Sequence, residues 1–189
     1  MIKPTMSTEF SEVESQHLSA LIGSRFHFLG GMDLPDFLMA AQVVISTSKH
    51  DLVFEGDIVV SDFQGYAENY SKITVRPAST SELSNLITGG NVYSEHSGAV
   101  ILDVYIVRRL IAELKTGSPS WLLSTSRAVV LDLGSTQLCL SKLGEHDEAL
   151  AITNMRGFEI SEVPSTSNHF EAELGVKYEV RDETISISL

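Results

Sequence analysis

A strict alternation of apolar and polar side chains near the C-terminus is the feature that most constrains how this chain folds. Over positions 170–181 every second residue is apolar, and most of the residues between them are charged. The apolar members are Phe170, Ala172, Leu174, Val176, Tyr178 and Val180. A period of two predicts a long β-strand with one buried face. Because Asp182 and Glu183 precede the apolar Ile185 and Ile187, the sequence predicts a turn at that pair and a terminal antiparallel hairpin with a charged exposed face.

Short runs rich in β-branched residues occupy much of the remaining chain. They lie at 43–45, 52–54, 58–60, 73–75, 128–133, 138–143, 149–153 and 158–162. Polar or glycine-containing segments separate the runs, which predicts antiparallel meanders. One helix is expected over 8–22, with Ser11 and Glu14 as a capping box. A second is expected to begin at 79–82 and to end at Gly89-Gly90.

The segment 99–115 carries two competing signals. β-branched residues dominate its first half, whereas five apolar residues keep helical spacing: Val104, Val107, Leu110, Ile111 and Leu114. Since no turn residue occurs before Gly117 and the run exceeds an ordinary strand, we expect a buried helix, with a strand over 99–107 as the alternative. The whole pattern predicts one α+β domain over 1–189, in which a twisted, largely antiparallel sheet packs on two or three helices.

The two halves of the chain, about 1–95 and 96–189, have similar patterns of apolar residues. Phe37-Leu38 precedes the run at 43–45 much as Trp121-Leu122 precedes the run at 129–131. An internal duplication would produce a pseudo-twofold arrangement. The alternative is coincidence, because any two β-meanders share such patterns.

Negative charge is concentrated at the two ends of the chain. The formal net charge is −12, and Lys+Arg against Asp+Glu number 3 against 10 in residues 1–68 and again in 145–189. Charge of this sign disfavours nucleic acid and anionic membranes as partners and attracts basic proteins. The start of the chain does not resemble a signal peptide, no apolar run is long enough to cross a bilayer, and Cys139 is the single cysteine. We therefore expect a cytoplasmic protein without disulfides.

One motif, the run Val-Val-Leu-Asp-Leu-Gly-Ser-Thr at 129–136, resembles the first phosphate-binding hairpin of the actin and sugar-kinase superfamily. The resemblance implies that Asp132 assists a metal and that Gly134, Ser135 and Thr136 contact phosphate. In that superfamily the hairpin opens its domain and long segments with a second phosphate loop follow, whereas only 53 residues follow here. The simpler interpretation, the turn of a β-hairpin, is favoured.

Other candidate chemistry is sparse. The six histidines show no HxH or HxxxH spacing, and the polar cluster at 145–148 is interpreted as a solvated turn in preference to a metal site. Asp103 lies inside an apolar run and is expected to pair with Arg108 or Arg109, with a site role as the alternative. No cofactor or metal is expected, because no phosphate-binding loop, dinucleotide fingerprint or nucleophile elbow occurs.

Two hypotheses of function remain. The favoured one is a non-enzymatic acidic protein that docks a basic protein partner, as an immunity protein, an antitoxin, a chaperone-like inhibitor or an adaptor would. Its candidate contacts are Glu145, Asp147, Glu148, Glu171, Glu173 and Glu179. The alternative is a small-ligand-binding protein or an enzyme, with a cleft between the sheet and the 99–115 helix lined by Asp103 and His96.

Overall fold

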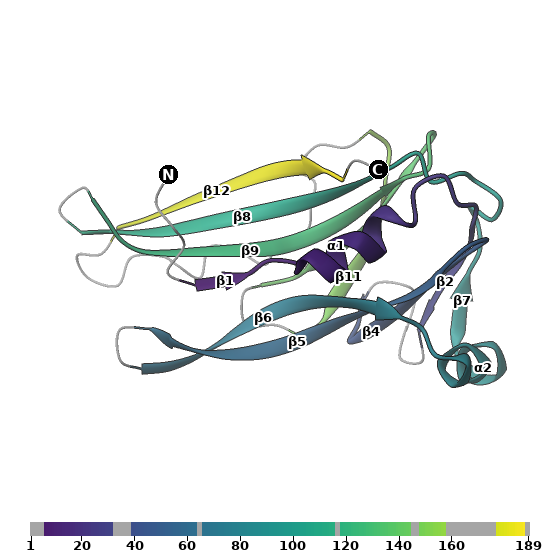
Figure 1. Ribbon diagram of the computed structural model, residues 1–189, viewed down its shortest axis with the longest axis horizontal. Coiled ribbons are helices and arrows are strands. Elements are labelled where there is room, and N and C mark those ends of the chain that lie inside the picture. The colour runs from purple at the N-terminus through teal and green to yellow at the C-terminus, as the bar shows by residue number, and fades with distance from the viewer. Residues whose placement is uncertain are drawn as a thin grey trace.

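The described part of the chain forms two largely antiparallel β-sheets and two short helices (Figure 1). The computed structural model describes residues 6–31, 39–63, 66–115, 118–144, 148–157 and 177–187. In this part of the chain the prediction of a largely antiparallel α+β protein is confirmed. The predicted strand at 158–162 and the alternating residues 170–176 lie outside the described residues.

The larger sheet has the strand order β12-β8-β9-β10-β11-β3, and β1 pairs with β9 in parallel. Its strands are β1 (Met6–Thr8), β3 (Met39–Ala40), β8 (Asp103–Lys115), β9 (Ser118–Asp132), β10 (Gln137–Lys142), β11 (Leu150–Met155) and β12 (Lys177–Ser186). All neighbours on the main path are antiparallel. The predicted strands at 128–133, 138–143 and 149–153 are therefore confirmed as parts of β9, β10 and β11.

The smaller sheet has the order β6-β5-β4-β2-β7. Its strands are β2 (Phe26–Gly31), β4 (Gln42–Thr47), β5 (Asp51–Phe63), β6 (Tyr66–Pro77) and β7 (Asn91–Tyr93). Successive antiparallel pairing of β4, β5 and β6 confirms a meander, but the runs at 52–54 and 58–60, predicted as separate strands, belong to the single strand β5.

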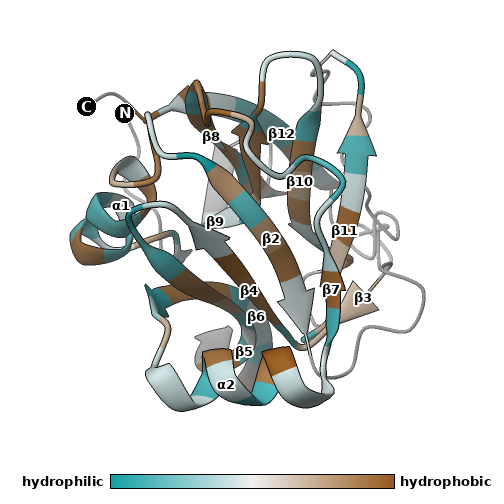
Figure 2. Ribbon diagram, turned by 90° about the vertical axis from the view of Figure 1, so that its right-hand side faces the viewer, coloured by the Kyte–Doolittle hydropathy of each residue, from teal (hydrophilic) through white to brown (hydrophobic). Residues whose placement is uncertain are grey.

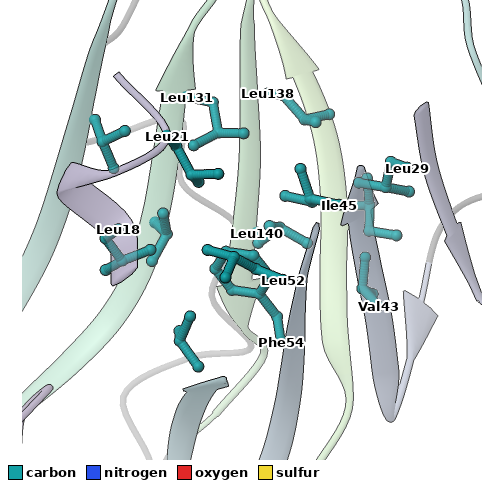
Figure 3. Close-up of a cluster of buried hydrophobic side chains, with 14 of the residues drawn as sticks. Leu18, Leu21, Leu29, Val43, Ile45, Leu52, Phe54, Leu131, Leu138 and Leu140 are labelled. Atoms are coloured by element: carbon teal, nitrogen blue, oxygen red, sulfur yellow. The ribbon is translucent and has the colours of Figure 1, made fainter. Parts of the chain in front are cut away.

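The main hydrophobic core lies between the two sheets. Alternate residues of β4 and β5 meet leucines of β9 and β10 in one buried cluster (Figure 3). The cluster includes Val43, Ile45, Leu52, Phe54, Leu131, Leu138 and Leu140. Because the largest buried cluster joins sheet to sheet, the finer prediction of a single sheet packed on two or three helices is not confirmed.

The predicted capping box of the first helix and the predicted start of the second are confirmed, but the first helix spans 12–19 rather than 8–22, because 6–8 form strand β1. Helix α1 (Glu12–Ser19) has the capping box of Ser11 and Glu14, and α2 (Thr80–Gly89) has that of Ser79 and Glu82. The carboxylate of Glu14 also accepts from the Val75 backbone at 3.2 Å, which ties α1 to β6. Helix α2 packs on the face of the smaller sheet that points away from the main core, where its Leu83 and Leu86 contact Val44 and Val53.

The helix predicted over 99–115 is wrong, because this segment forms strand β8 between β9 and β12. Val104 and Ile106 belong to the main core, whereas Val107 packs in a second buried cluster with Val130 and Cys139. A strand buried on both faces carries apolar residues at odd and even positions. That loss of alternation produced spacings which resemble those of a helix.

The predicted terminal hairpin is also wrong. Strand β12 continues through Asp182 and Glu183 and pairs with β8 along its whole length. Asp182 lies opposite Arg109, and Glu183 lies opposite Arg108. Cationic partners on the neighbouring strand allow two consecutive carboxylates to continue a strand in which a turn was expected.

The proposed duplication stays a prediction. Each half of the chain supplies four strands that pair in succession, β2-β4-β5-β6 and β8-β9-β10-β11, as a duplication would require. The matching strands differ in length, since β2 and β4 have 6 residues each whereas β8 and β9 have 13 and 15.

Candidate functional site

A cleft of about 530 Å³ opens where three segments from different parts of the chain converge. They are the residues after β7, the turn between β9 and β10, and the end of β11. The lining residues are Glu95, His96, Ser135, Thr136, Asn154, Met155 and Arg156. The end of β11 meets the end of β7 at this face although the two strands belong to different sheets (Figure 2). Their contact includes a hydrogen bond from Asn154 Nδ2 to Tyr93 Oη of 2.6 Å.

The turn between β9 and β10 is shaped by its own short-range hydrogen bonds. Gly134 has a φ of 86°, a left-handed conformation that favours glycine, and its backbone N–H donates to Asp132 Oδ1 at 2.8 Å. The Leu133 N–H donates to the Thr136 carbonyl at 3.0 Å. The prediction that 134–136 form a hairpin turn is therefore confirmed, and the turn leaves Ser135 exposed at the cleft.

The metal role implied for Asp132 by the family resemblance does not match its position. Its carboxylate caps the turn, accepts from Gln137 Nε2 at 3.3 Å, and is not among the side chains that line the cleft. Ser135 and Thr136 do line the cleft, although the Thr136 hydroxyl also donates to the Met155 carbonyl at 2.9 Å. A role for these two residues toward phosphate stays a prediction.

The phenol of Tyr93 organises one wall of the cleft. Its hydroxyl bonds to the Glu95 carboxylate and lies 3.3 Å from His96 Nε2, and the two rings meet edge to face. Burial raises the pKa of Tyr93, and the Glu95 carboxylate raises it further. The phenol therefore stays protonated at neutral pH and holds the carboxylate and the imidazole in place.

The side chains around the cleft form a mixed set of donors and acceptors. Arg156 contributes a permanently charged guanidinium with a fixed fork of donors, and Ser135 contributes a hydroxyl. His96 adds a ring nitrogen, Asn154 an amide and Glu95 a carboxylate. A few convergent polar groups in a concave site are typical of small-molecule binding sites.

Of the two residues predicted to line a cleft, only His96 does so. Asp103 begins β8, where its carboxylate accepts from Ser186 Oγ at 2.9 Å and from the Val104 N–H at 2.7 Å. The predicted cleft between a sheet and a 99–115 helix does not exist, because that segment is a strand of the sheet. The predicted pairing of Asp103 with Arg108 or Arg109 is wrong as well, since these arginines bind Glu183 and Asp182.

A second charged cluster spans strands β12, β8 and β9. The Asp182 carboxylate accepts from Arg109 at 2.8 and 2.9 Å and from Arg127 Nη1 at 2.5 Å. Arg127 is an extra residue of β9, since Ala128 lies opposite Val107 while Ser126 lies opposite the next residue of β8. Such a β-bulge redirects a side chain, and here it accompanies the arginine's contact with Asp182.

The six carboxylates predicted to dock a partner are only partly described. Glu148 precedes β11 and lies so close to β5 that a Cβ at Gly56 would be 1.7 Å from its carbonyl oxygen. Glu179 is exposed on β12, and strands β8, β9 and β10 lie between β12 and β11. These two residues are therefore not neighbours. Glu145, Asp147, Glu171 and Glu173 lie outside the described residues.

Sequence reasoning missed Tyr93, Asn154 and Arg156. Each follows or ends a short strand without a motif around it, so no local pattern indicates that they converge. The only local signal at this cleft was the Gly-Ser-Thr turn. Within the described ranges no three His, Cys, Asp or Glu side chains gather as a metal site would require.

The chain matches no protein-family model, and comparison with curated proteins and with solved structures also found no match. In the part of the chain that the structure describes, neither helix has the length and apolar character needed to cross a membrane.

Proposed function

We propose that the protein binds, in the cleft beside His96, a small polar ligand that carries an anionic group. The observation that supports this proposal is the convergence of Arg156, Ser135 and His96 from three separate segments on one concave surface. Guanidinium and hydroxyl donors are suited to carboxylate or phosphate oxygens. Glu95, which Tyr93 holds in place, is available to accept a hydrogen bond from a donor elsewhere on the same ligand.

Thermal denaturation and calorimetric titration with inorganic phosphate, citrate and adenosine monophosphate test the proposal. A ligand that binds only the folded state stabilises it by about 2.7 kcal/mol when its concentration is 100 times Kd. At least one probe is expected to raise the melting temperature in a concentration-dependent manner. If all three anions leave the melting temperature unchanged at millimolar concentration, the proposal is wrong.

The variant Arg156→Gln assigns any such binding to the cleft. Loss of a charge-assisted hydrogen bond costs about 1.5–3 kcal/mol, which weakens binding by about tenfold or more. Lys49→Gln is the matched control, because it removes one positive charge from the exposed β4–β5 turn, outside the cleft lining. Equal affinity of Arg156→Gln and wild type would place the binding elsewhere.

A second candidate function is the docking of a basic protein partner, for which the net charge of −12 is the supporting observation. That net value already subtracts the carboxylates that arginine or lysine binds within the chain, which are Glu14, Glu55, Glu82, Asp182 and Glu183. The exposed carboxylates that remain, Glu148 and Glu179 among them, are the contacts proposed for a partner. Complementary charge mainly accelerates association and selects the correct partner.

Pulldown from the native host at low and then high salt, followed by binding measurements with any basic protein identified, tests this second candidate. Glu148→Gln is expected to slow association with that protein, whereas Arg156→Gln leaves it unchanged. If the proteins retained in the pulldown do not depend on salt concentration, or include no basic protein, this candidate is contradicted and the cleft proposal is unaffected.

A further inference from the structure

Strand β12 is the edge strand of the larger sheet as far as the described residues form it. Among the described strands it pairs with β8 alone, along ten residues of regular antiparallel register. The central residues Glu179, Val180 and Arg181 are exposed, and Val180 retains 38% of its accessible surface. An exposed edge strand presents backbone groups that are able to pair with another chain.

The charges along β12 are self-complementary when the strand is paired with a second copy in the antiparallel direction. Lys177, Glu179, Arg181 and Glu183 occupy alternate register positions along β12. In a pairing centred on Val180, Lys177 lies opposite Glu183 of the second copy, and Glu179 lies opposite Arg181. The two-fold symmetry repeats each pair, so that oppositely charged residues face each other at four register positions, in addition to the Arg108–Glu183 and Arg181–Glu183 pairs within each copy.

Other registers have less of this complementarity, and an axis at Tyr178 would pair only Lys177 with Glu179. A two-fold axis normal to a continuous sheet must place one residue opposite its own copy. An axis at Glu179, Arg181 or Asp182 would place a charged residue opposite an identical one, and like charges directly opposite each other are destabilising. An axis at Val180 places an exposed apolar side chain opposite its copy instead.

We propose that the protein forms a two-fold symmetric dimer in which β12 pairs antiparallel with β12 of a second copy about Val180. The two larger sheets then become one continuous sheet across the interface. The opposite charges select the register, and the paired backbone groups supply the attraction. The proposal is independent of the cleft and of any basic partner.

Cysteine cross-linking tests the register. In the dimer the Cβ atoms of residue 180 in the two copies are about 4.5–5.5 Å apart, so oxidised Val180→Cys is expected to form a covalent dimer. The native cysteine does not compete, because burial raises the pKa of the Cys139 thiol to about 12. The control is Thr184→Cys, exposed on the same strand. Its two copies would lie about 27 Å apart at 3.4 Å per residue and are expected to remain uncross-linked.

Charge exchange tests the complementarity. Sedimentation equilibrium at about 0.15 M salt, where charges more than about 8 Å apart are screened, measures the dimer dissociation constant. Glu179→Arg places like charges opposite each other at two symmetric positions and is expected to weaken the dimer by about tenfold. The double variant Glu179→Arg/Arg181→Glu restores opposite charges and is expected to recover most of that loss.

Three results would overturn the dimer. The first is a protein that stays monomeric at every concentration up to about 100 μM, a range in which specific dimers associate. The second is cross-linking of Thr184→Cys that is as efficient as that of Val180→Cys. The third is a dimer dissociation constant that Glu179→Arg leaves unchanged. Far-UV circular dichroism of each variant shows that the strand substitutions leave the fold intact, so none of these results is attributable to unfolding.

Discussion

At the scale of single residues, the Asp182 carboxylate lies between two arginines that solvent hardly reaches. The Arg127 side chain is 5% exposed and that of Arg109 is 12% exposed. Burial raises the pKa of Asp182, but the hydrogen bonds and charges of Arg109 and Arg127 lower it more, and the net result lies below its ordinary value. The carboxylate therefore stays ionised at neutral pH and joins β12 to β8 and β9.

Asp182→Asn is expected to destabilise the protein by about 3 kcal/mol, because it removes the negative charge that joins the largely buried Arg109 and Arg127. Urea denaturation followed by circular dichroism measures the loss. Glu179→Gln, on the same strand and exposed, is expected to change the free energy of unfolding by less than about 0.5 kcal/mol. Equal effects of the two substitutions would mean that the buried cluster contributes nothing beyond an exposed carboxylate.

At the scale of elements, the first turn of α2 combines a capping box with an ion pair. Glu82 accepts from Arg76 Nη2 at 2.7 Å and from Arg76 Nη1 at 3.1 Å, and it also accepts from the Ser79 backbone at 2.7 Å. The Arg76 guanidinium, followed by the bonds from Ser79, lowers the pKa of Glu82 to about 2. The ionised carboxylate thus fastens the start of α2 to the end of β6.

This lowered pKa predicts a specific loss of stability in acid. A carboxylate whose folded pKa lies below its unfolded pKa stabilises the fold above the unfolded value, near 4.5, and the contribution disappears as pH falls toward about 2. We expect about 1 kcal/mol, since Glu82 borders solvent and water screens the pair. Melting temperatures of wild type and Glu82→Gln should therefore converge between pH 4.5 and pH 2.

Glu12→Gln serves as the control for the acid experiment, because Glu12 also lies in the first turn of a helix but is exposed. The melting temperature of Glu12→Gln should stay close to that of wild type over the same pH range. A difference in melting temperature between wild type and Glu82→Gln that stays constant down to pH 2 would contradict the assignment of the acid-sensitive stability to ionisation of Glu82.

The elements also show how far local sequence information extends. The capping boxes of Ser11 and Ser79 were predictable because all of their partners lie within three residues. Strand β8 was not predictable in this way, because its strand conformation depends on pairing with β9 and β12. Burial of both of its faces also removed the alternation of apolar and polar residues. Asp182 looked like a turn residue for a similar reason, since its arginine partners lie 55 and 73 positions earlier.

At the scale of the whole molecule, the two sheets share one buried core to which both halves of the chain contribute. The substitution Phe54→Ala, on β5, removes a fully buried ring from that core and is expected to cost about 3–5 kcal/mol. Trp121, the single tryptophan, lies on β9 in the other sheet and packs against Tyr70 of β6, so its fluorescence reports on the larger sheet and on its contact with the smaller one. If the chain is one domain, circular dichroism and Trp121 fluorescence of the variant shift together to lower denaturant.

Val60→Ala is the control for the core experiment, because Val60 lies on the same strand and is 65% exposed. It is expected to leave both transitions in place. Two separate transitions in Phe54→Ala, with the Trp121 signal unmoved, would show that the halves unfold independently.

The sequence by itself determined the β-rich class, the two helix starts, the meander over β4–β6 and the turn at Gly134. Each of these depends on dihedral preferences, caps or periodicity within a few neighbouring residues. Only the tertiary structure decided that 99–115 is a strand, that β12 runs straight through Asp182, and that His96 meets Ser135 and Arg156 in one cleft. These features depend on contacts between residues far apart in the chain, and the free energy of such contacts leaves no local pattern in the sequence.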